Sequence, residues 1–194
     1  NPPLPVSECD LVQPMTIYSA GKFATENYLR IHAKENGVSA PILRFSTVYG
    51  PLETVPRAIP NFIRRILAGK PPIIYGSGDD VRDYVHVNDV VEATLLALIQ
   101  DTGEFQVFNI GSGKGYKTRE IAEKVIELKG KPIKPLHKPS NHDPYRIVCD
   151  ISRACNALGY QPKVELDQGL LDEIEFFTAN PKLWNKLNEK NFAL

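Results

Sequence analysis

Apolar residues recur along this chain in two periods, one typical of helices and one typical of buried strands. The helical period predicts a long amphipathic helix over 14–36, ended by Gly37, and further helices at 61–68, from Asn88 to about 98, at 118–130, 152–158 and 167–180. Short apolar runs predict strands at 40–45, 73–75, 82–87 and 105–110. Strands that alternate with helices indicate an α/β fold with parallel pairing.

The remaining segments are rich in proline or in turn-forming residues. Residues 1–13 and 47–60 are therefore expected to be loops. Asn88 is expected to cap the helix that follows it, because an Asn side chain accepts a hydrogen bond from a free backbone N–H. The buried face of that helix is expected to carry Val90, Val91, Ala93, Leu95, Leu96 and Leu98.

Composition excludes several classes of function. The chain has 194 residues, 42% of them hydrophobic, and a net charge of zero, which is enough for a substantial core and gives no electrostatic footprint for nucleic acid or an acidic membrane. It contains no apolar run long enough to span a bilayer and no signal-peptide pattern. It begins with Asn1 rather than Met, so we expect that Asn1 is not the start of the gene product.

Cysteine and histidine usage favours a reducing, cytoplasmic setting without a metal centre. The three cysteines are too scattered for a disulfide framework or a zinc site; they are Cys9, Cys149 and Cys155. The four histidines show no metal-ligand spacing; they are His32, His86, His137 and His142.

The pair Tyr18 and Lys22 carries the most information about chemistry. Residues four apart lie on the same face of a helix, so the phenol and the ammonium can reach one site. A nearby cation favours the phenolate form, and a phenolate can take a proton from a hydroxyl. A surface lysine beside a packed tyrosine is the alternative interpretation.

Several further motifs occur in a fixed order. They are Leu43-Arg44-Phe45-Ser46-Thr47-Val48-Tyr49-Gly50-Pro51, Ile74-Tyr75-Gly76-Ser77-Gly78, Arg82-Asp83-Tyr84-Val85-His86-Val87-Asn88-Asp89-Val90 and Phe108-Asn109-Ile110-Gly111-Ser112-Gly113. With Tyr18 and Lys22 ahead of them, they make the chain resemble the C-terminal two-thirds of an extended short-chain dehydrogenase/reductase. The branch it resembles is that of the NAD-dependent nucleotide-sugar epimerases and dehydratases.

The resemblance implies an enzyme that uses NAD on a UDP- or dTDP-linked sugar. Tyr18 would exchange the proton of a sugar hydroxyl, usually at C4, and Lys22 would hold the nicotinamide ribose. Tyr49 would lie beside the nicotinamide. Arg82 would bind the substrate's diphosphate, for which a guanidinium is well suited, unless it forms a surface pair with Asp83.

Other residues have implied roles with open alternatives. Asn109 would lie near the sugar nucleotide, although the Gly111–Gly113 segment also fits a plain turn. Arg146 would add a second positive contact, or it faces solvent. Asp89 is expected to cap or brace the helix after the Arg82 motif.

The chain departs from the family pattern at several places. Thr47 stands where relatives usually have a substrate-binding Asn, Ser140 where they commonly have an Arg, and Ile17 where a Pro is usual. The family's Gly-rich dinucleotide loop, its ribose-binding acid and its catalytic Ser or Thr precede the Tyr, and none is present here. We therefore expect the chain alone to hold NAD poorly.

The resulting prediction is an α/β chain made of the C-terminal part of a Rossmann-type parallel sheet and a smaller mixed α/β substrate-binding lobe. Residues 1–50 would be the remnant of the NAD-binding domain. Residues 51–194 would form mainly the nucleotide-sugar lobe, with some segments returning to the Rossmann sheet. A homodimer through the helix that bears Tyr18 is implied as well, with Ala24, Tyr28 and Ile31 on the contact face, unless these three residues are core.

The predicted activity is nucleotide-sugar 4-epimerisation in the cytoplasm, a preference that rests slightly on Glu26. The nearest alternative is a nucleotide-sugar 4,6-dehydratase of the same family. A different class of alternative is a non-catalytic fragment or substrate-binding module.

Overall fold

The computed structural model describes residues 3–100, 102–103, 105–141 and 143–181. Their helices are α1 (Ile17–Asn36), α2 (Ala58–Leu67), α3 (Val87–Ile99), α4 (Thr118–Leu128), α5 (Ser152–Leu158) and α6 (Leu166–Ala179). Their strands are β1 (Ala40–Phe45), β2 (Thr47–Tyr49), β3 (Ile73–Tyr75), β4 (Val81–His86), β5 (Phe105–Ile110), β6 (Gly115–Lys117), β7 (Leu136–Lys138) and β8 (Arg146–Ile147). His142, one of the histidines considered above, lies outside the described residues.

The strands pair mainly in parallel, as the alternation of strands and helices predicted. β1 pairs with β5, β2 with β4, and β3 with β7, all in parallel. On its other side β4 pairs in parallel with β8 and antiparallel with β6. The predicted α/β class is confirmed, because parallel neighbours need the helical crossovers that the chain supplies.

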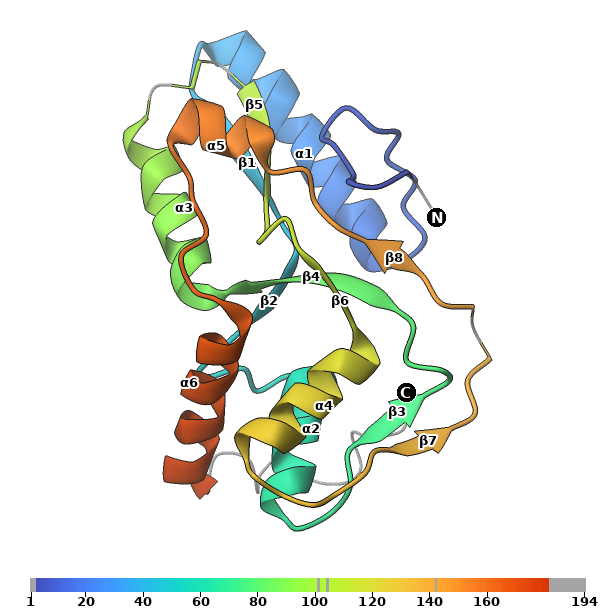
Figure 1. Ribbon diagram of the computed structural model, residues 1–194. Helices are drawn as coiled ribbons and strands as arrows, with labels where there is room; N and C mark the ends of the chain where they lie inside the picture. Colours follow the sequence, from blue (N-terminus) through green and yellow to red (C-terminus); the bar gives the residue numbers. More distant parts are fainter. Residues whose placement is uncertain (1–2, 101, 104, 142, 182–194) are drawn as a thin grey trace.

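Two apolar cores lie at the two ends of the molecule, with β4 crossing between them (Figure 1). One core joins β5, α3 and α5 and includes Val85, Phe108, Ile110 and Tyr160. The other joins α2, α4 and α6 and includes Tyr84, Ile63, Ile121 and Leu170. Adjacent residues of β4 therefore enter different cores, because side chains alternate across a strand.

The first helix begins and ends at identifiable local signals. Thr16 and Ser19 form reciprocal hydrogen bonds across its first turn, so α1 begins at Ile17 and not at the predicted residue 14. Gly37 ends it in the left-handed conformation, with φ of 61°, as predicted.

Other boundaries differ from the sequence prediction. Residues 47–49 form β2 rather than loop, and α2 begins at Ala58 rather than at 61. Pro60 falls in the first turn of α2, where its missing N–H costs nothing. The cap of α3 is His86, whose Nδ1 accepts a hydrogen bond from the N–H of Asn88 at 3.3 Å, so the prediction that Asn88 is the cap was wrong.

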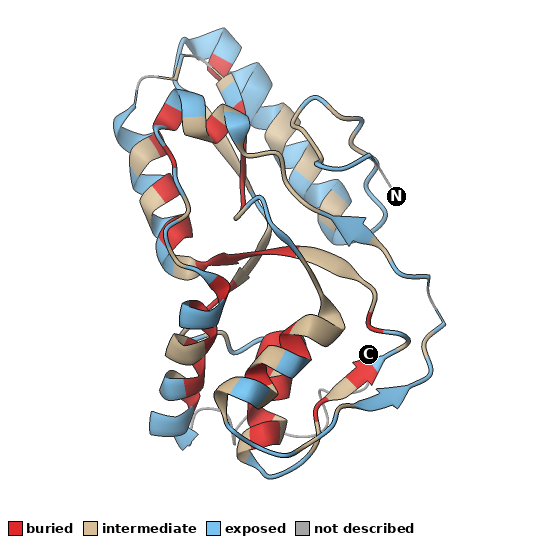
Figure 2. Cartoon of the chain, viewed as in Figure 1, coloured by how far each residue is buried: buried red, intermediate tan, exposed pale blue. Residues whose placement is uncertain are grey.

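The apolar face of α3, predicted to be buried, and the stripe of α1, left open between dimer contact and core, are largely exposed (Figure 2). On α3, Val90 and Ala93 are buried, but Val91, Leu95 and Leu98 are 52%, 56% and 78% exposed. On α1, the only buried residue among those described is Ala33. Ala24, Tyr28 and Ile31 are therefore not part of a core formed by the described residues.

The contact of α6 with β2 and β4 depends on a glycine. A Cβ added at Gly169 would lie 2.8 Å from Cζ of Tyr49 and 2.9 Å from Cδ2 of His86, closer than real contacts allow. We expect Gly169→Ala to lower the free energy of unfolding by about 1–3 kcal/mol, because a tightly packed site resists added volume. Thermal unfolding measures the effect.

Gly21 of α1 provides the matched control for this prediction. A Cβ there meets no atom within 4 Å, so Gly21→Ala should stabilise the protein by about 0.5–1 kcal/mol through helix propensity. An increase in melting temperature for both variants would contradict the packing argument for Gly169.

Candidate functional site

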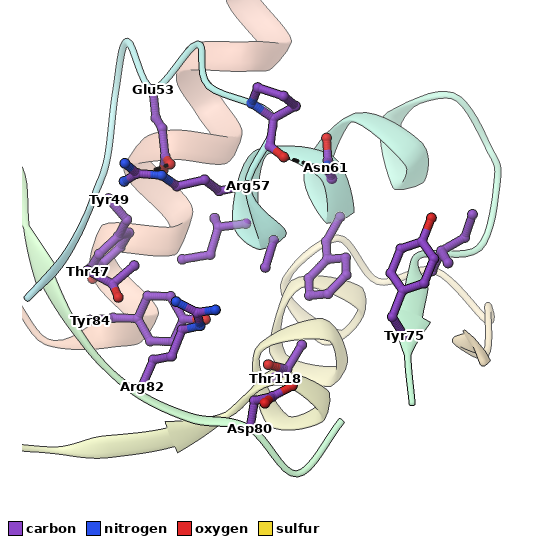
Figure 3. Close-up of a pocket in the computed structure, with 15 residues that line it drawn as sticks. Thr47, Tyr49, Glu53, Arg57, Asn61, Tyr75, Asp80, Arg82, Tyr84 and Thr118 are labelled. Atoms are coloured by element: carbon purple, nitrogen blue, oxygen red, sulfur yellow. Dashed lines mark hydrogen bonds and ion pairs between the residues drawn. The ribbon is translucent and has the colours of Figure 1, made fainter. Parts of the chain in front are cut away.

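A cavity of about 440 Å³ opens between β2, β4 and α2 (Figure 3). This volume is in the range of small-molecule sites in proteins. Its polar lining comes from elements far apart in the sequence, namely Thr47, Glu53, Arg57, Asn61, Tyr75, Asp80, Arg82, Tyr84 and Thr118. Aromatic rings beside guanidinium and hydroxyl groups make the cavity suited to a ligand with both a planar and an anionic part.

The guanidinium of Arg82 is fixed at the wall of this cavity. Arg82 and Tyr84 point to the same face of β4, because they lie two residues apart in the strand. Cζ of Arg82 lies 4.5 Å from the ring centroid of Tyr145, a stacking contact. Asp80 holds Tyr145 in turn, since its Oδ1 accepts the backbone N–H of Tyr145 at 3.1 Å. The cation is therefore positioned, while its donors remain available to a ligand.

Thr47 and Tyr49 reach the cavity from β2. The register pairs Thr47 with Tyr84 and Tyr49 with His86. Tyr49 is only 2% exposed and its ring packs edge-on against Tyr84 and His86. Burial and nearby carboxyl groups, Glu173 first, raise the pKa of Tyr49, so its phenol stays protonated and serves as a wall of the cavity.

Tyr18 and Lys22 lie together on the exposed face of α1. The Nζ of Lys22 is 5.7 Å from the ring centroid of Tyr18, which is the neighbourhood that the four-residue spacing predicts. Tyr18 is 75% exposed, so its hydroxyl is accessible. Neither residue lines the cavity that contains Arg82.

Asn109 is placed away from the cavity. Its side-chain amide donates to the backbone oxygens of Val6 and Asp150, at 3.0 and 3.3 Å, and it is 5% exposed. These bonds fasten the N-terminal segment to β5. The structure thus does not bring Asn109 together with Thr47 and Arg82.

The Gly111–Gly113 turn is held by a buried carboxylate. Asp83, 1% exposed, accepts the N–H of Ser112 at 2.7 Å, that of Gly113 at 3.1 Å and that of Cys149 at 3.2 Å. The alternative interpretation of Arg82 and Asp83 as a surface pair is therefore wrong, because Asp83 is buried. Two N–H groups of the turn point at Asp83, and the turn leads into β6 rather than directly into a helix.

Three other residues considered in the sequence analysis lie outside the cavity. Asp89 accepts the N–H groups of Lys163 and Val164, so it braces the segment that precedes α6. Glu26 bonds to Arg44 at 2.6 and 3.0 Å and thereby ties α1 to β1. Arg146 is exposed on β8, where its backbone pairs with Val81, and it does not line the cavity.

Sequence reasoning missed two acidic residues at this site. Glu53 lines the cavity, and burial raises its pKa to about 7 although Arg57 opposes the shift. Behind it, Glu173 of α6 is fully buried, and burial followed by the charge of Glu53 raises its pKa to about 9. No sequence signal marks these residues, since each is a single acid in an otherwise ordinary segment.

Two features are not found among the described residues. No group of three or more His, Cys, Asp or Glu side chains among them is placed to hold a metal ion. No helix among them is long and apolar enough to cross a membrane.

The residues present fit one end of a dinucleotide. Tyr18 and Lys22 offer an accessible phenol and an ammonium side by side, which suits the ribose and the reacting end of a nicotinamide cofactor. The only Gly-rich turn that follows a strand towards a helix, among the described residues, gives two of its N–H groups to Asp83 and does not serve as a pyrophosphate cradle.

Parallel strands covered by helices, with a ligand-sized cavity beside them, define an α/β protein of the Rossmann kind. Residues 2–111 match the model of the NAD dependent epimerase/dehydratase family. The chain therefore belongs to that family, as the motifs indicated, and NAD is the family's cofactor.

Individual relatives agree with this assignment. The chain is 36% identical over 180 residues to UDP-glucose 4-epimerase of Mycolicibacterium smegmatis, covering 91% of this chain and 57% of the relative. It superimposes with a TM-score of 0.85 and 35% identity on UDP-glucose 4-epimerase of Thermotoga maritima with UDP-glucose, covering 91% of this chain and 58% of that one.

A second activity occurs among the similar structures. The dTDP-glucose 4,6-dehydratase of Bacillus anthracis in complex with NAD superimposes with a TM-score of 0.86 and 27% identity, covering 95% of this chain and 59% of that one. The chain thus spans about three-fifths of the length of these relatives.

Proposed function

We propose that the whole protein is an NAD-dependent nucleotide-sugar 4-epimerase and that this chain supplies its nucleotide-sugar site and its acid/base pair. The observation that carries the proposal is the cavity that Arg82, stacked on Tyr145, lines together with Thr47 and Tyr84. A fixed guanidinium beside aromatic rings suits a nucleoside diphosphate. The similarity to two UDP-glucose 4-epimerases supports the choice of a UDP-linked sugar.

In this proposal the protein's own groups bind, orient and exchange a proton. NAD, when bound, supplies the hydride chemistry. The Oη of Tyr18 takes the proton of a sugar hydroxyl and later returns one, and Lys22 contacts the nicotinamide ribose. Arg82 holds the diphosphate, Thr47 contacts the sugar, and Tyr49 lies as a protonated wall beside them. Asn109 and Arg146 remain proposed as weaker substrate contacts, because neither of them lines the cavity that would hold the diphosphate.

Replacing Arg82 tests the diphosphate contact. Arg82→Ala is expected to weaken UDP-glucose affinity by about 1.5–3 kcal/mol, roughly 10- to 150-fold, because charge-assisted hydrogen bonds to phosphate are lost. Isothermal titration calorimetry measures the loss. Arg30→Ala is the control, since it removes the same charge from the exposed surface of α1. Equal affinities of the Arg82 and Arg30 variants would remove Arg82 from the site.

A nucleotide-sugar 4,6-dehydratase is the second candidate. The fit to the Bacillus anthracis dTDP-glucose 4,6-dehydratase favours it, and Glu26 no longer argues against it, because Glu26 is engaged with Arg44. Product analysis separates the two activities. Epimerisation of UDP-glucose yields UDP-galactose of equal mass, whereas dehydration of a nucleotide sugar yields a 4-keto-6-deoxy product that is lighter by one water.

The remaining alternative is a binding module without turnover. Separate titrations of the protein with UDP-glucose and with NAD distinguish it from an enzyme. Binding of both ligands with turnover supports the proposal. Binding of UDP-glucose with no NAD binding and no turnover supports a substrate-binding module, and failure to bind any nucleotide sugar would overturn both.

The organisation of the protein is proposed along the same lines. We assign residues 1–50 to the NAD-binding domain and 51–194 mainly to the substrate lobe, with α3, β5 and α5 returning to the core of the first. We also propose a cytoplasmic homodimer in which α1 meets its copy through Tyr28, 77% exposed, and Ile31, 48% exposed. A monomer in sedimentation velocity would contradict the dimer.

A further inference from the structure

Two buried carboxyl groups flank the turn that follows β2. Glu173 of α6 is 0% exposed, and the side chain of Glu53 is 10% exposed. The Oε2 of Glu173 accepts the backbone N–H of Gly50 at 3.1 Å, and the N–H of Glu53 donates to the backbone oxygen of Gly50 at 3.1 Å. Gly50 thus donates a hydrogen bond to Glu173 of α6 and accepts one from the backbone of Glu53.

Each of these carboxyl groups has one oxygen without a partner. The Oε1 of Glu173 and the Oε2 of Glu53 are buried and make no hydrogen bond within the described part of the chain. An ionised carboxylate in this situation carries a full desolvation cost, whereas a protonated one carries much less. Two carboxyl groups that interact at close range also do not both ionise readily.

The groups around the pair offer little compensation. Arg57 places Nη1 3.9 Å from Oε1 of Glu53, but its side chain is 55% exposed and its contribution is weak. A second cation, Arg82, lines the same cavity and acts on Tyr84. The other titratable groups around this cluster are phenols, a histidine and carboxyl groups, namely Tyr49, Tyr84, His86, Asp80, Asp89, Tyr116 and Asp172. Burial lowers the pKa of His86, so it adds no cation near neutral pH.

We propose that Glu173 carries a proton at neutral pH and forms with Glu53 an acid pair that fastens the Gly50–Glu53 turn to α6. Glu173 is then a positioning residue. It acts through Gly50 on the segment whose residues Thr47, Tyr49 and Glu53 line the cavity. Loss of the proton strengthens the bond that Gly50 donates, but it places a second negative charge inside the pair, and the repulsion between Glu53 and Glu173 then loosens the turn.

The direction of the pH dependence follows from where the protons are held. Burial raises the pKa of Glu173 to about 9 and that of Glu53 to about 7, both above the ordinary value of 4.5 that applies in the unfolded chain. The folded protein therefore binds these protons more tightly than the unfolded one. The stabilisation they give is complete below pH 4.5 and is lost as the pH rises towards 9.

Thermal unfolding at pH 5 and pH 8.5 tests the pair without any ligand. The melting temperature of the wild type should fall between these values by roughly 5 °C more than that of Glu173→Gln, which keeps an oxygen for Gly50 and has no proton to lose. Glu175→Gln makes the same chemical change on the exposed side of α6 and should follow the wild type. Parallel curves for the wild type and Glu173→Gln would overturn the proposal.

Infrared spectroscopy detects the proton directly and remains informative if one variant is unstable. The difference spectrum of wild type minus Glu173→Gln at pH 7 should contain the carbonyl stretch of a protonated carboxylic acid, and this band should vanish well above pH 9. Glu53→Gln should shift the loss of the band to lower pH, since the neighbouring charge that raises the pKa of Glu173 is removed. Only carboxylate bands at pH 7 would refute the assignment.

A functional readout rests on the proposed nucleotide-sugar site. UDP-glucose affinity of the wild type should fall several-fold from pH 7 to pH 9.5, and that of Glu173→Gln should stay level. If no UDP-glucose binds at any pH, the proposed function fails, while the melting and infrared results still decide the acid pair.

Discussion

Tyr18→Phe is expected to abolish measurable turnover of the whole protein while leaving nucleotide-sugar binding within a few fold. The change removes one oxygen, the atom proposed to exchange the proton of the sugar hydroxyl. General acid–base catalysis by a positioned side chain contributes about 10²–10⁴-fold to rate. Because Tyr18 is 75% exposed and its ring lies beside the ammonium of Lys22 on the same face of α1, the substitution should not disturb the core.

Tyr28 provides a control within the same helix. It is 77% exposed, and Tyr28→Phe makes the identical chemical change ten positions further along α1. Its turnover should match that of the wild type within twofold. Steady-state kinetics with NAD and UDP-glucose, together with calorimetric affinity, separates a loss of chemistry from a loss of binding. Retained turnover in Tyr18→Phe would remove Tyr18 as the acid/base.

Asp83→Asn is expected to produce the largest loss of stability. The carboxylate of Asp83 accepts three backbone N–H groups and the hydroxyl of Ser112, at 2.7–3.2 Å. An amide replaces one of the two accepting oxygens with an N–H₂ donor that faces other donors. Leaving buried N–H groups unsatisfied costs about 1–3 kcal/mol each, so the total should be about 3–4 kcal/mol after relaxation.

Thermal or urea unfolding measures this effect. The melting temperature should fall by roughly 10 °C for a chain of this size. Asp167→Asn is the matched control, because Asp167 is 58% exposed and pairs with Lys124 at the surface. Its effect should stay below about 1 kcal/mol. Similar melting temperatures for the two variants would mean that Asp83 does not hold the turn.

The elements that sequence predicted well are those with local signals. The first helix ends at a glycine that adopts the left-handed conformation, and β1 and β5 are apolar runs of six residues each. The strands that were missed, β2, β6, β7 and β8, have two or three residues each and exist through their partners. No local pattern specifies such a strand, because its hydrogen bonds come from distant segments.

The candidate site likewise contains residues that the sequence indicated and residues that it did not indicate. Tyr18 and Lys22 could be proposed from the sequence because a spacing of four residues places both on one face of a helix. Arg82 could be proposed because it lies within a motif. The acid pair was not, since Glu173 meets the Gly50 turn from 123 positions away. The predicted burial of the α3 stripe failed for a related reason. Helical spacing tells which residues share a face, but not whether another element covers that face.

The successive residues of β4 each have a different task. Arg82 faces the cavity, Asp83 holds the Gly111–Gly113 turn, Tyr84 and Val85 enter separate cores, and His86 caps α3. A shift of one residue turns every side chain of a strand to the opposite face. A single deletion within this segment would therefore disrupt all of these contacts at once. A change in the length of this strand should therefore be more damaging than any single substitution within it.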